Sequence, residues 1–286
     1  MDERLVLAMD GATNASTAAL LALGREQGSR VVARRVDLDS RGQARVLLRL
    51  VDDMLRETGQ GPADIAAIVA GVGPGTFTGV RIAVATARAL ALALEIPIVG
   101  VSTLSALVAE TAGLEGFTGE TAPEVIVPVV DARRGQVFYG LYRRTEVAPA
   151  YVRTEPFAVC DRDSLFSVVA PRGARALIVG DLDGLDAAPG SGEQARISLR
   201  PVQVRAEHLL MGQDSLGEPG EGAEGSRLDG WLAGVLSAGG AHRTWLWKAG
   251  EPGSPEAVKP IYVRSPDADI HITKMRDPWA DAAAER

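Results

Sequence analysis

The sequence predicts an α/β fold built from two similar halves. Each half opens with an apolar strand that leads into a loop carrying an aspartate, Asp10 in the first half and Asp131 in the second. The first half also holds a glycine-rich turn between a short strand and a long helix, as in a βα unit. The residues of the two halves show no clear repeat, so the order of elements carries the predicted duplication.

The first half begins with strands. The apolar run at 4–9, the Ala- and Leu-rich run at 15–23 and residues 31–38 are typical of strands. Turn-like residues separate the second run from the third. We therefore expect an antiparallel hairpin or meander, with a polar loop at 10–14 after the first strand.

Helices then alternate with strands. Apolar side chains recur at helical spacing over 43–58, and the glycine that follows ends the helix. A strand over 65–70, a helix over 80–94 and a strand over 98–101 come next. Residues 102–112 are predicted as another helix, with Ser102 or Thr103 as its cap.

The second half repeats the opening motif. A strand over 125–130, a turn over 131–135 and a returning strand over 136–142 form a predicted hairpin. A further strand is expected at 176–179.

These elements define the predicted domains. We expect an N-terminal subdomain over 1–112 and a C-terminal subdomain over 113–269, followed by a tail at 270–286. Gly, Glu, Ser and Pro are concentrated at 212–230, a composition typical of a flexible linker within the second subdomain.

Composition limits the classes of function. The 286 residues are 46% hydrophobic, which allows a packed core and excludes global disorder. The net charge of −7 disfavours a stand-alone nucleic-acid binder, because phosphate neutralisation requires a basic surface. Cys160 is the single cysteine, which excludes an internal disulfide and fits a cytoplasmic location. His208, His242 and His271 are too scattered to suggest a metal pair.

No targeting or membrane segment is expected. The charged opening residues do not resemble a signal peptide. The most apolar stretch, 80–101, is interrupted by Arg81, Arg88 and Glu95.

The segment Gly73–Gly79, which reads Gly-Pro-Gly-Thr-Phe-Thr-Gly, is the most informative motif. It could present backbone amides to an anion. However, it lacks the lysine of a P-loop and the last glycine of the dinucleotide fingerprint. Spacing alone favours a tight structural turn, with Thr78 capping the following helix.

Two aspartate loops leave alternatives open. Asp10 could bind phosphate and magnesium, although an ordinary polar turn is favoured. The turn that contains Asp131, Arg133 and Arg134 could contact RNA or phosphate, or could be a solvated hairpin tip. Cys160 has no nucleophile motif around it and is expected to be a packing or surface residue.

The helix over 80–94 has two interpretations. Its charged residues, Arg81, Arg88 and Glu95, are seven residues apart and fall nearly on one line of the helix. The remaining residues are apolar or small, so most of the helix surface must pack on something. A fully buried core helix is the commoner case. The alternative is that this helix and the one over 43–58 form a partner-binding surface.

Residues 73–89 resemble the signature of the TsaB (YeaZ) family, and four further segments resemble the family in the expected order: 6–10, 96–104, 130–138 and 260–264. The resemblance covers most of the chain and is densest over 65–112. Departures are Asp10-Gly11, Gln43-Ala44 and Gly180-Asp181-Leu182, the last of which weakens any case for nucleotide binding.

The resemblance implies an actin-like (ASKHA, RNase H-like) α/β fold with two similar subdomains. It implies a non-catalytic scaffold in the complex that forms N6-threonylcarbamoyladenosine beside the anticodon, at position 37 of tRNAs reading A-starting codons. The implied partners are the TsaD-type transferase, which the scaffold activates, and the TsaE-type ATPase. Contact with tRNA would be indirect. We expect a homodimer when the chain is alone, and no tightly bound cofactor, with ATP or ADP and Mg only in the complex.

The residues predicted to act fall into three sets, with none catalytic and none binding metal. The signature loop comprises Gly73, Pro74, Gly75, Thr76, Phe77, Thr78, Gly79 and Arg81. The predicted partner interface comprises Leu47, Leu50, Val51, Met54, Ile82, Ala83, Thr86, Ala87 and Leu90. The RNA or phosphate contacts would be Asp131, Arg133 and Arg134.

The main alternative function is a stand-alone ATP-binding enzyme of the actin and sugar-kinase class. It would need Asp10 and Asp131 to hold Mg-ATP between the two halves. Tight, magnesium-dependent ATP binding by the isolated chain would favour it. A peptidase is rejected, because no zinc pair and no Ser/His arrangement is recognisable.

Overall fold

The computed structural model describes residues 3–24, 28–38, 43–112, 122–145, 151–172, 175–185, 197–210 and 254–263. The segment at 212–230 and the tail at 270–286 lie outside the described residues, and so do His242 and His271.

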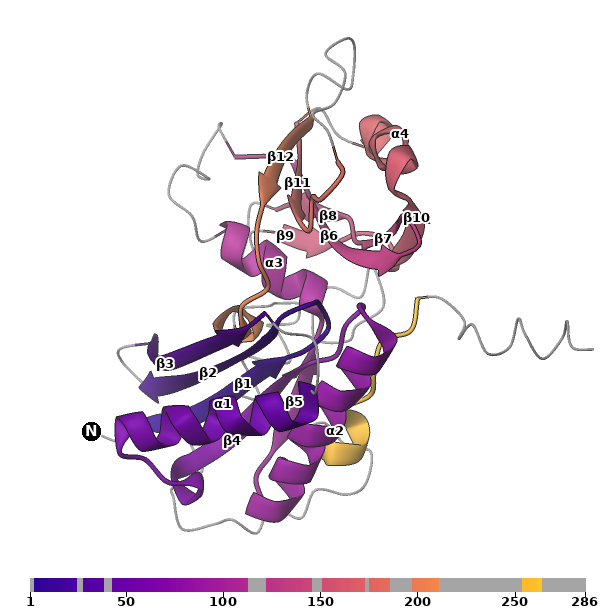
Figure 1. Ribbon diagram of the computed structural model, residues 1–286. Coiled ribbons are helices and arrows are strands. Elements are labelled where there is room, and N and C mark those ends of the chain that lie inside the picture. The colour runs from indigo at the N-terminus through magenta and orange to yellow at the C-terminus, as the bar shows by residue number, and fades with distance from the viewer. Residues whose placement is uncertain are drawn as a thin grey trace, which may run out of the picture.

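The first sheet begins as the expected meander. It comprises β1 (Arg4–Asp10), β2 (Ser16–Gly24) and β3 (Gly28–Asp37), each antiparallel to the next. β4 (Ile65–Gly71) and β5 (Ile98–Val101) are parallel to β1, giving the order β3-β2-β1-β4-β5 (Figure 1). Alternate residues of β1 pack into different clusters on the two faces, so both faces are buried and the strand is almost entirely apolar.

The second sheet repeats this topology. Its main path comprises β6 (Val125–Arg133), β7 (Gln136–Tyr139), β10 (Ala158–Asp161), β11 (Ala176–Gly180) and β12 (Ile197–Pro201), in the order β10-β7-β6-β11-β12. β8 (Tyr142–Arg144) and β9 (Tyr151–Arg153) form a side pair next to β6. Numbered within each half, both sheets have the order third, second, first, fourth, fifth. The two predicted halves are therefore confirmed by topology.

The helices connect these strands. α1 (Gln43–Thr58) and α2 (Phe77–Leu94) pack against each other and lie beside the first sheet (Figure 1). α3 (Thr103–Ala112) follows β5, and the short α4 (Leu165–Val169) precedes β11. Single 3-10 turns are η1 (Pro62–Asp64), η3 (Arg162–Ser164), η4 (Ala170–Arg172), η6 (Ala206–Leu209) and η7 (Pro255–Ala257).

Helix starts differ slightly from expectation. α2 begins at Phe77, and Thr76, with extended backbone, is its N-cap residue, so the predicted cap at Thr78 is wrong. The N-cap lies two residues earlier because the Thr76 carbonyl already accepts a 3.0 Å hydrogen bond from the Val80 amide. At α3, the Ser102 hydroxyl accepts a 3.2 Å hydrogen bond from the Leu104 amide, so Ser102 caps this helix as one of the two predicted residues. The strands β8 to β10 and β12 and helix α4 were not expected from the sequence.

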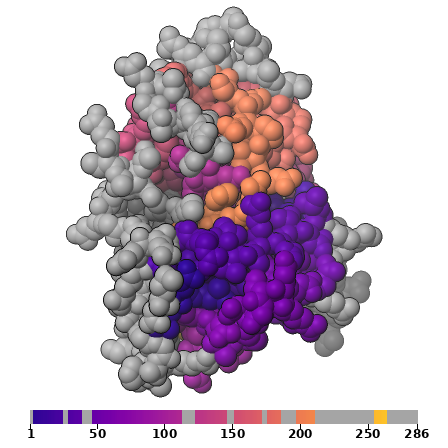
Figure 2. All heavy atoms as spheres, turned by 90° about the vertical axis from the view of Figure 1, so that its left-hand side faces the viewer, coloured from indigo at the N-terminus to yellow at the C-terminus, as the bar shows by residue number. Residues whose placement is uncertain are grey.

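The two subdomains interlock through segments far apart in sequence. Leu104 and Leu107 of α3 are buried with Ile126 and Val130 of the second sheet. Conversely, Leu209 at the end of η6 packs in the core of the first sheet. Figure 2 shows the orange residues of β12 and η6 running from one subdomain onto the other. α3 and η6 therefore each contribute side chains to the core of the other subdomain.

Candidate functional site

The glycine-rich loop joins the ends of three strands. After β4, the Gly73 carbonyl accepts a 2.9 Å hydrogen bond from the Thr103 amide, which follows β5. The Thr76 amide donates a 2.7 Å hydrogen bond to the carbonyl of Ala12, which follows β1. A Cβ on Gly75 would lie 2.1 Å from that same oxygen, so a side chain is excluded there. These contacts give the loop the structural role that the spacing favoured.

Glycine is also required at Gly73 and at the contact between Gly79 and Gly11. Gly73 has a φ of +87°, in the region that disfavours side chains, and its peptide bond to Pro74 is cis. Gly79 lies in the first turn of α2, and its carbonyl would be 3.3 Å from a Cβ on Gly11. α2 therefore starts in close contact with the loop that follows β1.

Asp10 lies beneath this junction. One of its carboxylate oxygens accepts a 2.7 Å hydrogen bond from the Ala12 amide, and the other accepts one of 2.7 Å from the Thr103 hydroxyl. Burial raises the pKa of Asp10, while these two hydrogen bonds act to lower it. A Cβ on Gly71 would overlap the carboxylate, so the sequence keeps room for it. These hydrogen bonds make Asp10 a structural link between the end of β1 and the start of α3.

Asp131 is similarly engaged, at the tip of the β6–β7 hairpin. Its Oδ1 oxygen accepts hydrogen bonds from the Arg133 amide at 3.0 Å and the Arg162 guanidinium at 3.2 Å. The Arg133 guanidinium also donates a 2.5 Å hydrogen bond to the side-chain oxygen of Asn14, which links the two subdomains. Arg133 and Arg134, both exposed and both with positive φ, form the turn. Asp131 therefore orients Arg133 and Arg162, and the contact of this turn with RNA or phosphate stays a prediction.

No cluster of three or more His, Cys, Asp or Glu side chains suited to a metal ion occurs in the ranges that the structure describes. Cys160 is half-buried on β10, and burial raises the pKa of its thiol.

The predicted partner interface needs a correction. Six of its nine residues are buried in the core of the first subdomain, each at most 5% exposed: Leu47, Leu50, Val51, Met54, Ala83 and Ala87. Their helical periodicity marks the inward faces of α1 and α2, which pack on the sheet and on each other. Only Ile82, Thr86 and Leu90 are half-exposed.

The outward face of α2 is the unusual surface. Its exposed residues after the first turn are Arg81, Ala85, Ala89, Leu92 and Ala93, and Leu92 is 59% exposed. The outward face of α1 differs, because Leu48 is flanked there by charged side chains such as Arg49, Asp52 and Asp53. The sparsely charged exposed surface therefore belongs to α2.

By length and composition, α2 could cross a membrane, and one third of it is buried. The helix packs on β4 and α1, and core helices of folded proteins share this composition. The expected absence of a membrane partner stays a prediction.

Arg81 has an unusual setting at the start of α2. Its guanidinium carbon lies 3.5 Å from the centre of the Phe77 ring, and its Nε donates a 2.8 Å hydrogen bond to the Tyr262 hydroxyl. Ile261 anchors this distant segment, since its amide donates to the Val72 carbonyl at 2.8 Å. Residues 260–263 of the late motif thus meet the signature, although they fall within the predicted C-terminal subdomain.

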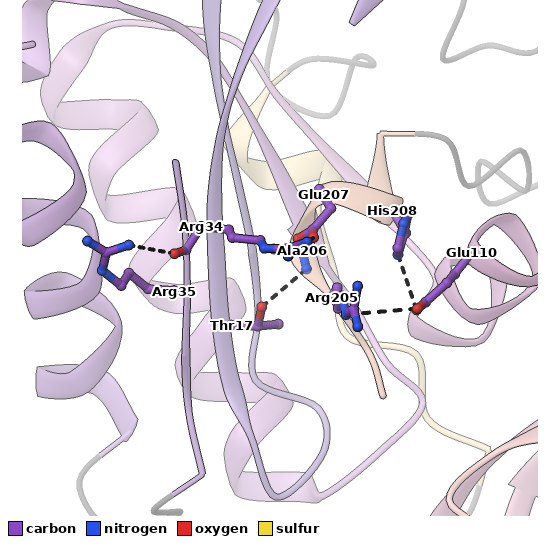
Figure 3. A network of polar contacts seen from close by, with 8 residues as sticks. All are labelled: Thr17, Arg34, Arg35, Glu110, Arg205, Ala206, Glu207 and His208. Atoms are coloured by element: carbon purple, nitrogen blue, oxygen red, sulfur yellow. Dashed lines mark hydrogen bonds and ion pairs between the residues drawn. The ribbon is translucent and has the colours of Figure 1, made fainter. Parts of the chain in front are cut away.

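A polar network joins the subdomains (Figure 3), and no sequence motif predicted it. The Ala206 amide donates to the Thr17 hydroxyl at 3.2 Å, and the Arg34 guanidinium lies 3.0 Å from the carboxylate of Glu207. The carboxylate of Glu110 on α3 forms an ion pair with the Arg205 guanidinium at 3.8 Å. The same carboxylate lies 3.2 Å from Nδ1 of His208. Only the folded chain brings these residues together, and no local motif marks them.

The topology defines the class of protein. Two α/β subdomains of the same strand order form the predicted actin-like (RNase H-like) fold, which is confirmed. Residues 37–155 match the family model described as TsaD, tRNA N6-adenosine threonylcarbamoyltransferase.

Particular relatives are similar to this chain. The tRNA threonylcarbamoyladenosine biosynthesis protein TsaB of Escherichia coli is 36% identical over 141 residues, 49% of this chain and 56% of that protein. The protein of the same name from Bacillus subtilis is 37% identical over 93 residues, 32% of this chain and 37% of the relative. The structure of YeaZ from Pseudomonas aeruginosa is 25% identical with a TM-score of 0.57, covering 91% of this chain and 99% of that one.

These similarities confirm the resemblance to the TsaB (YeaZ) family. In sequence, the chain spans 56% and 37% of the length of the two curated relatives. The fold match extends over nearly all of YeaZ.

Proposed function

We propose that this chain is a non-catalytic subunit of an assembly that forms N6-threonylcarbamoyladenosine at position 37 of tRNAs reading A-starting codons. In this role it binds and activates a TsaD-type transferase, and a TsaE-type ATPase joins the assembly. The proposal rests on the names of the similar proteins and on one observation, the exposed and sparsely charged face of α2. It places the protein in the cytoplasm and its contact with tRNA within the complex.

The α2 face is suited to a helical partner. Ala85, Ala89 and Ala93 are exposed and four residues apart, so they lie on one side of the helix and allow close approach of a second helix. Leu92 adds apolar area that would leave water on docking. The same face would join two copies of the chain when the transferase is absent, giving the expected homodimer.

The internal hydrogen bonds support a non-catalytic role. Both oxygens of Asp10 are already hydrogen-bonded within the chain, and Asp131 is committed to Arg133 and Arg162. A stand-alone ATP-binding enzyme would need these carboxylates for magnesium. We accordingly propose that the isolated chain binds no nucleotide tightly, and that ATP or ADP with Mg binds only in the complex.

The test is size-exclusion chromatography with light scattering, on the chain alone and mixed with the TsaD-type protein of the same organism. The wild type should exchange its homodimer for a heteromer. Ala89→Glu should fold, since glutamate is a good helix former, but should lose the heteromer because it places a charge in the apolar face. Ala63→Glu, at an exposed position on η1, is the matched control and should bind like the wild type.

Failure of the wild type to associate would contradict the scaffold role. Equal binding by Ala89→Glu and the wild type would exclude the α2 face as the docking surface. Tight magnesium-dependent ATP binding by the isolated chain would instead favour the enzyme.

A further inference from the structure

We propose that Arg81 is a preorganised receptor for the carboxylate of an acidic side chain on the protein that docks on α2. This inference rests on the proposed function and adds to it a specific anchor residue. The anchor is composite, because Arg81 and Phe77 belong to α2 whereas Tyr262 comes from the far end of the described chain.

The first argument is the rigidity of the side chain. Phe77 stacks on the guanidinium, with 3.5 Å between the guanidinium carbon and the ring centre. Tyr262 holds the Nε atom by a 2.8 Å hydrogen bond, and its ring centre lies 5.5 Å from the same carbon. The two rings are 5.8 Å apart and tilted by 42°, so they flank the arginine from two sides. An arginine held in this way loses little side-chain entropy when it binds a partner.

The second argument is the unused hydrogen-bonding capacity of Arg81. Its contacts in the described part of the chain are the two rings and the Tyr262 hydroxyl, and none is to a carboxylate. By contrast, Arg34, Arg49 and Arg162 all pair with carboxylates. With Nε occupied, the two terminal nitrogens of Arg81 remain for a planar anion, which an arginine fork binds in a bidentate manner.

The third argument is the surface around the anchor. Phe77 and Tyr262 are 43% and 49% exposed, and Ala85 continues the exposed face along α2. An arginine framed by aromatic rings beside an apolar strip has the composition of a protein–protein hot spot. The net charge of −7 makes this chain a poor surface for an RNA backbone, so the anion is assigned to a protein side chain rather than to a phosphate.

The position of Tyr262 is itself supported by packing. Val258 is buried in the core of the first subdomain, and Ile261 donates to the Val72 carbonyl. The segment that carries Tyr262 is therefore fixed on the first subdomain before any partner arrives. Tyr262 acts as a positioning residue, since its hydroxyl sets the direction of the guanidinium.

The experiment measures the affinity of the full chain for the TsaD-type protein by isothermal titration calorimetry at two salt concentrations. Arg81→Gln should weaken binding by at least about 30-fold, the loss expected on removing a hot-spot side chain. Arg81→Lys should not restore it, because lysine keeps the charge but lacks the planar fork. Tyr262→Phe should weaken binding by about 3- to 10-fold, corresponding to one hydrogen bond.

Arg56→Gln is the matched control, because Arg56 is an exposed arginine of α1, outside the α2 face, and has no aromatic partner among the described contacts. It should change affinity by less than about 3-fold. The salt dependence of binding should fall in Arg81→Gln and persist in Arg56→Gln. Circular dichroism should show all variants folded, because Arg81 is exposed.

Four results would overturn the inference. Wild-type affinity in Arg81→Gln would remove Arg81 from the interface while leaving the proposed function in place. Full rescue by Arg81→Lys would reduce its role to a simple charge. Unchanged transferase affinity together with lost tRNA retention would assign the anion to phosphate. Absence of wild-type binding would overturn both the proposed function and this inference.

Discussion

The hydroxyl of Thr103 donates a 2.7 Å hydrogen bond to the buried carboxylate of Asp10, which links the start of α3 to the end of β1. α3 in turn contributes Leu104 and Leu107 to the core of the second subdomain. The link therefore lies where the chain passes from one subdomain to the other, at the position where the sequence allowed a magnesium ligand.

Substitution of Asp10 tests this structural role. Asp10→Ala leaves the Ala12 amide and the Thr103 hydroxyl without their acceptor, so it should lower the free energy of unfolding by about 1–3 kcal/mol. Asp10→Asn should cost less. The side-chain carbonyl of the asparagine can accept from the Ala12 amide, and the Thr103 hydroxyl can rotate to accept from its NH2 group. Urea unfolding followed by circular dichroism measures both. A larger loss in Asp10→Asn than in Asp10→Ala would contradict the assignment.

The pH dependence of stability gives a separate prediction for Asp10. Burial raises the pKa of this carboxyl above its ordinary value, so the folded chain holds the proton more tightly than the unfolded chain. The resulting contribution to stability is complete below the unfolded pKa and is lost as the pH rises through the folded pKa. The wild type should therefore gain stability relative to Asp10→Asn as the pH falls from 7 toward 4. An opposite trend in paired urea titrations would show that the pKa is lowered instead.

Gly75→Ala should be severely destabilising. The new Cβ would lie 2.1 Å from the Ala12 carbonyl oxygen, the acceptor of the Thr76 amide, so the loops after β1 and β4 would have to separate. We expect a loss of about 2–4 kcal/mol, measured by chemical unfolding. Gly61→Ala is the matched control, because its Cβ would meet only an Asp64 oxygen at 3.6 Å. Equal stability of the two variants would exclude the steric explanation.

Arg34→Ala should destabilise the link between the subdomains. The Glu207 side chain is 5% exposed, and removal of Arg34 leaves its carboxylate without this partner at the surface of the first sheet. The expected cost is about 1–3 kcal/mol. Arg30→Ala breaks an exposed pair with Glu3 and should cost less than about 1 kcal/mol. Similar costs for the two variants in thermal unfolding would show that the Glu207 pair is an ordinary surface contact.

The hairpin arginines give a prediction about tRNA. If Arg133 and Arg134 contact phosphate in the assembled complex, Arg133→Ala and Arg134→Ala should each reduce the salt dependence of tRNA binding by about one counterion. Asn14→Ala is the control for Arg133, because it removes their mutual hydrogen bond and keeps the charge. Filter binding over a salt series provides the measurement. Unchanged slopes would make this turn a solvated hairpin tip.

Local residue patterns determined much of the fold. The apolar period of α1 placed that helix at the bounds found in the structure, and the turn residues around 131–135 defined the β6–β7 hairpin. The motif Gly73–Gly79 marked the junction between β4 and α2. These features could be predicted because helical periodicity, tight turns and close backbone approach depend on residues near one another in sequence.

Periodicity showed that α1 and α2 have apolar faces, but not which side of each helix faces water. Ala87 lies within the subdomain and Ala89 faces outward, although both are alanines of one apolar helix. Burial depends on where the sheet and the neighbouring helix lie, and those contacts join residues distant in sequence. Most residues of the predicted interface therefore lie on the inward faces of α1 and α2.

By itself, the sequence determined the two-part α/β order, the family resemblance and the structural character of the glycine loop. Tertiary structure decided that Asp10 braces α3, that Tyr262 reaches Arg81, and that η6 returns to the first sheet. Each of these contacts joins residues at least 93 positions apart. No local propensity encodes such a pairing, because it exists only once the chain has folded and buried the surfaces between.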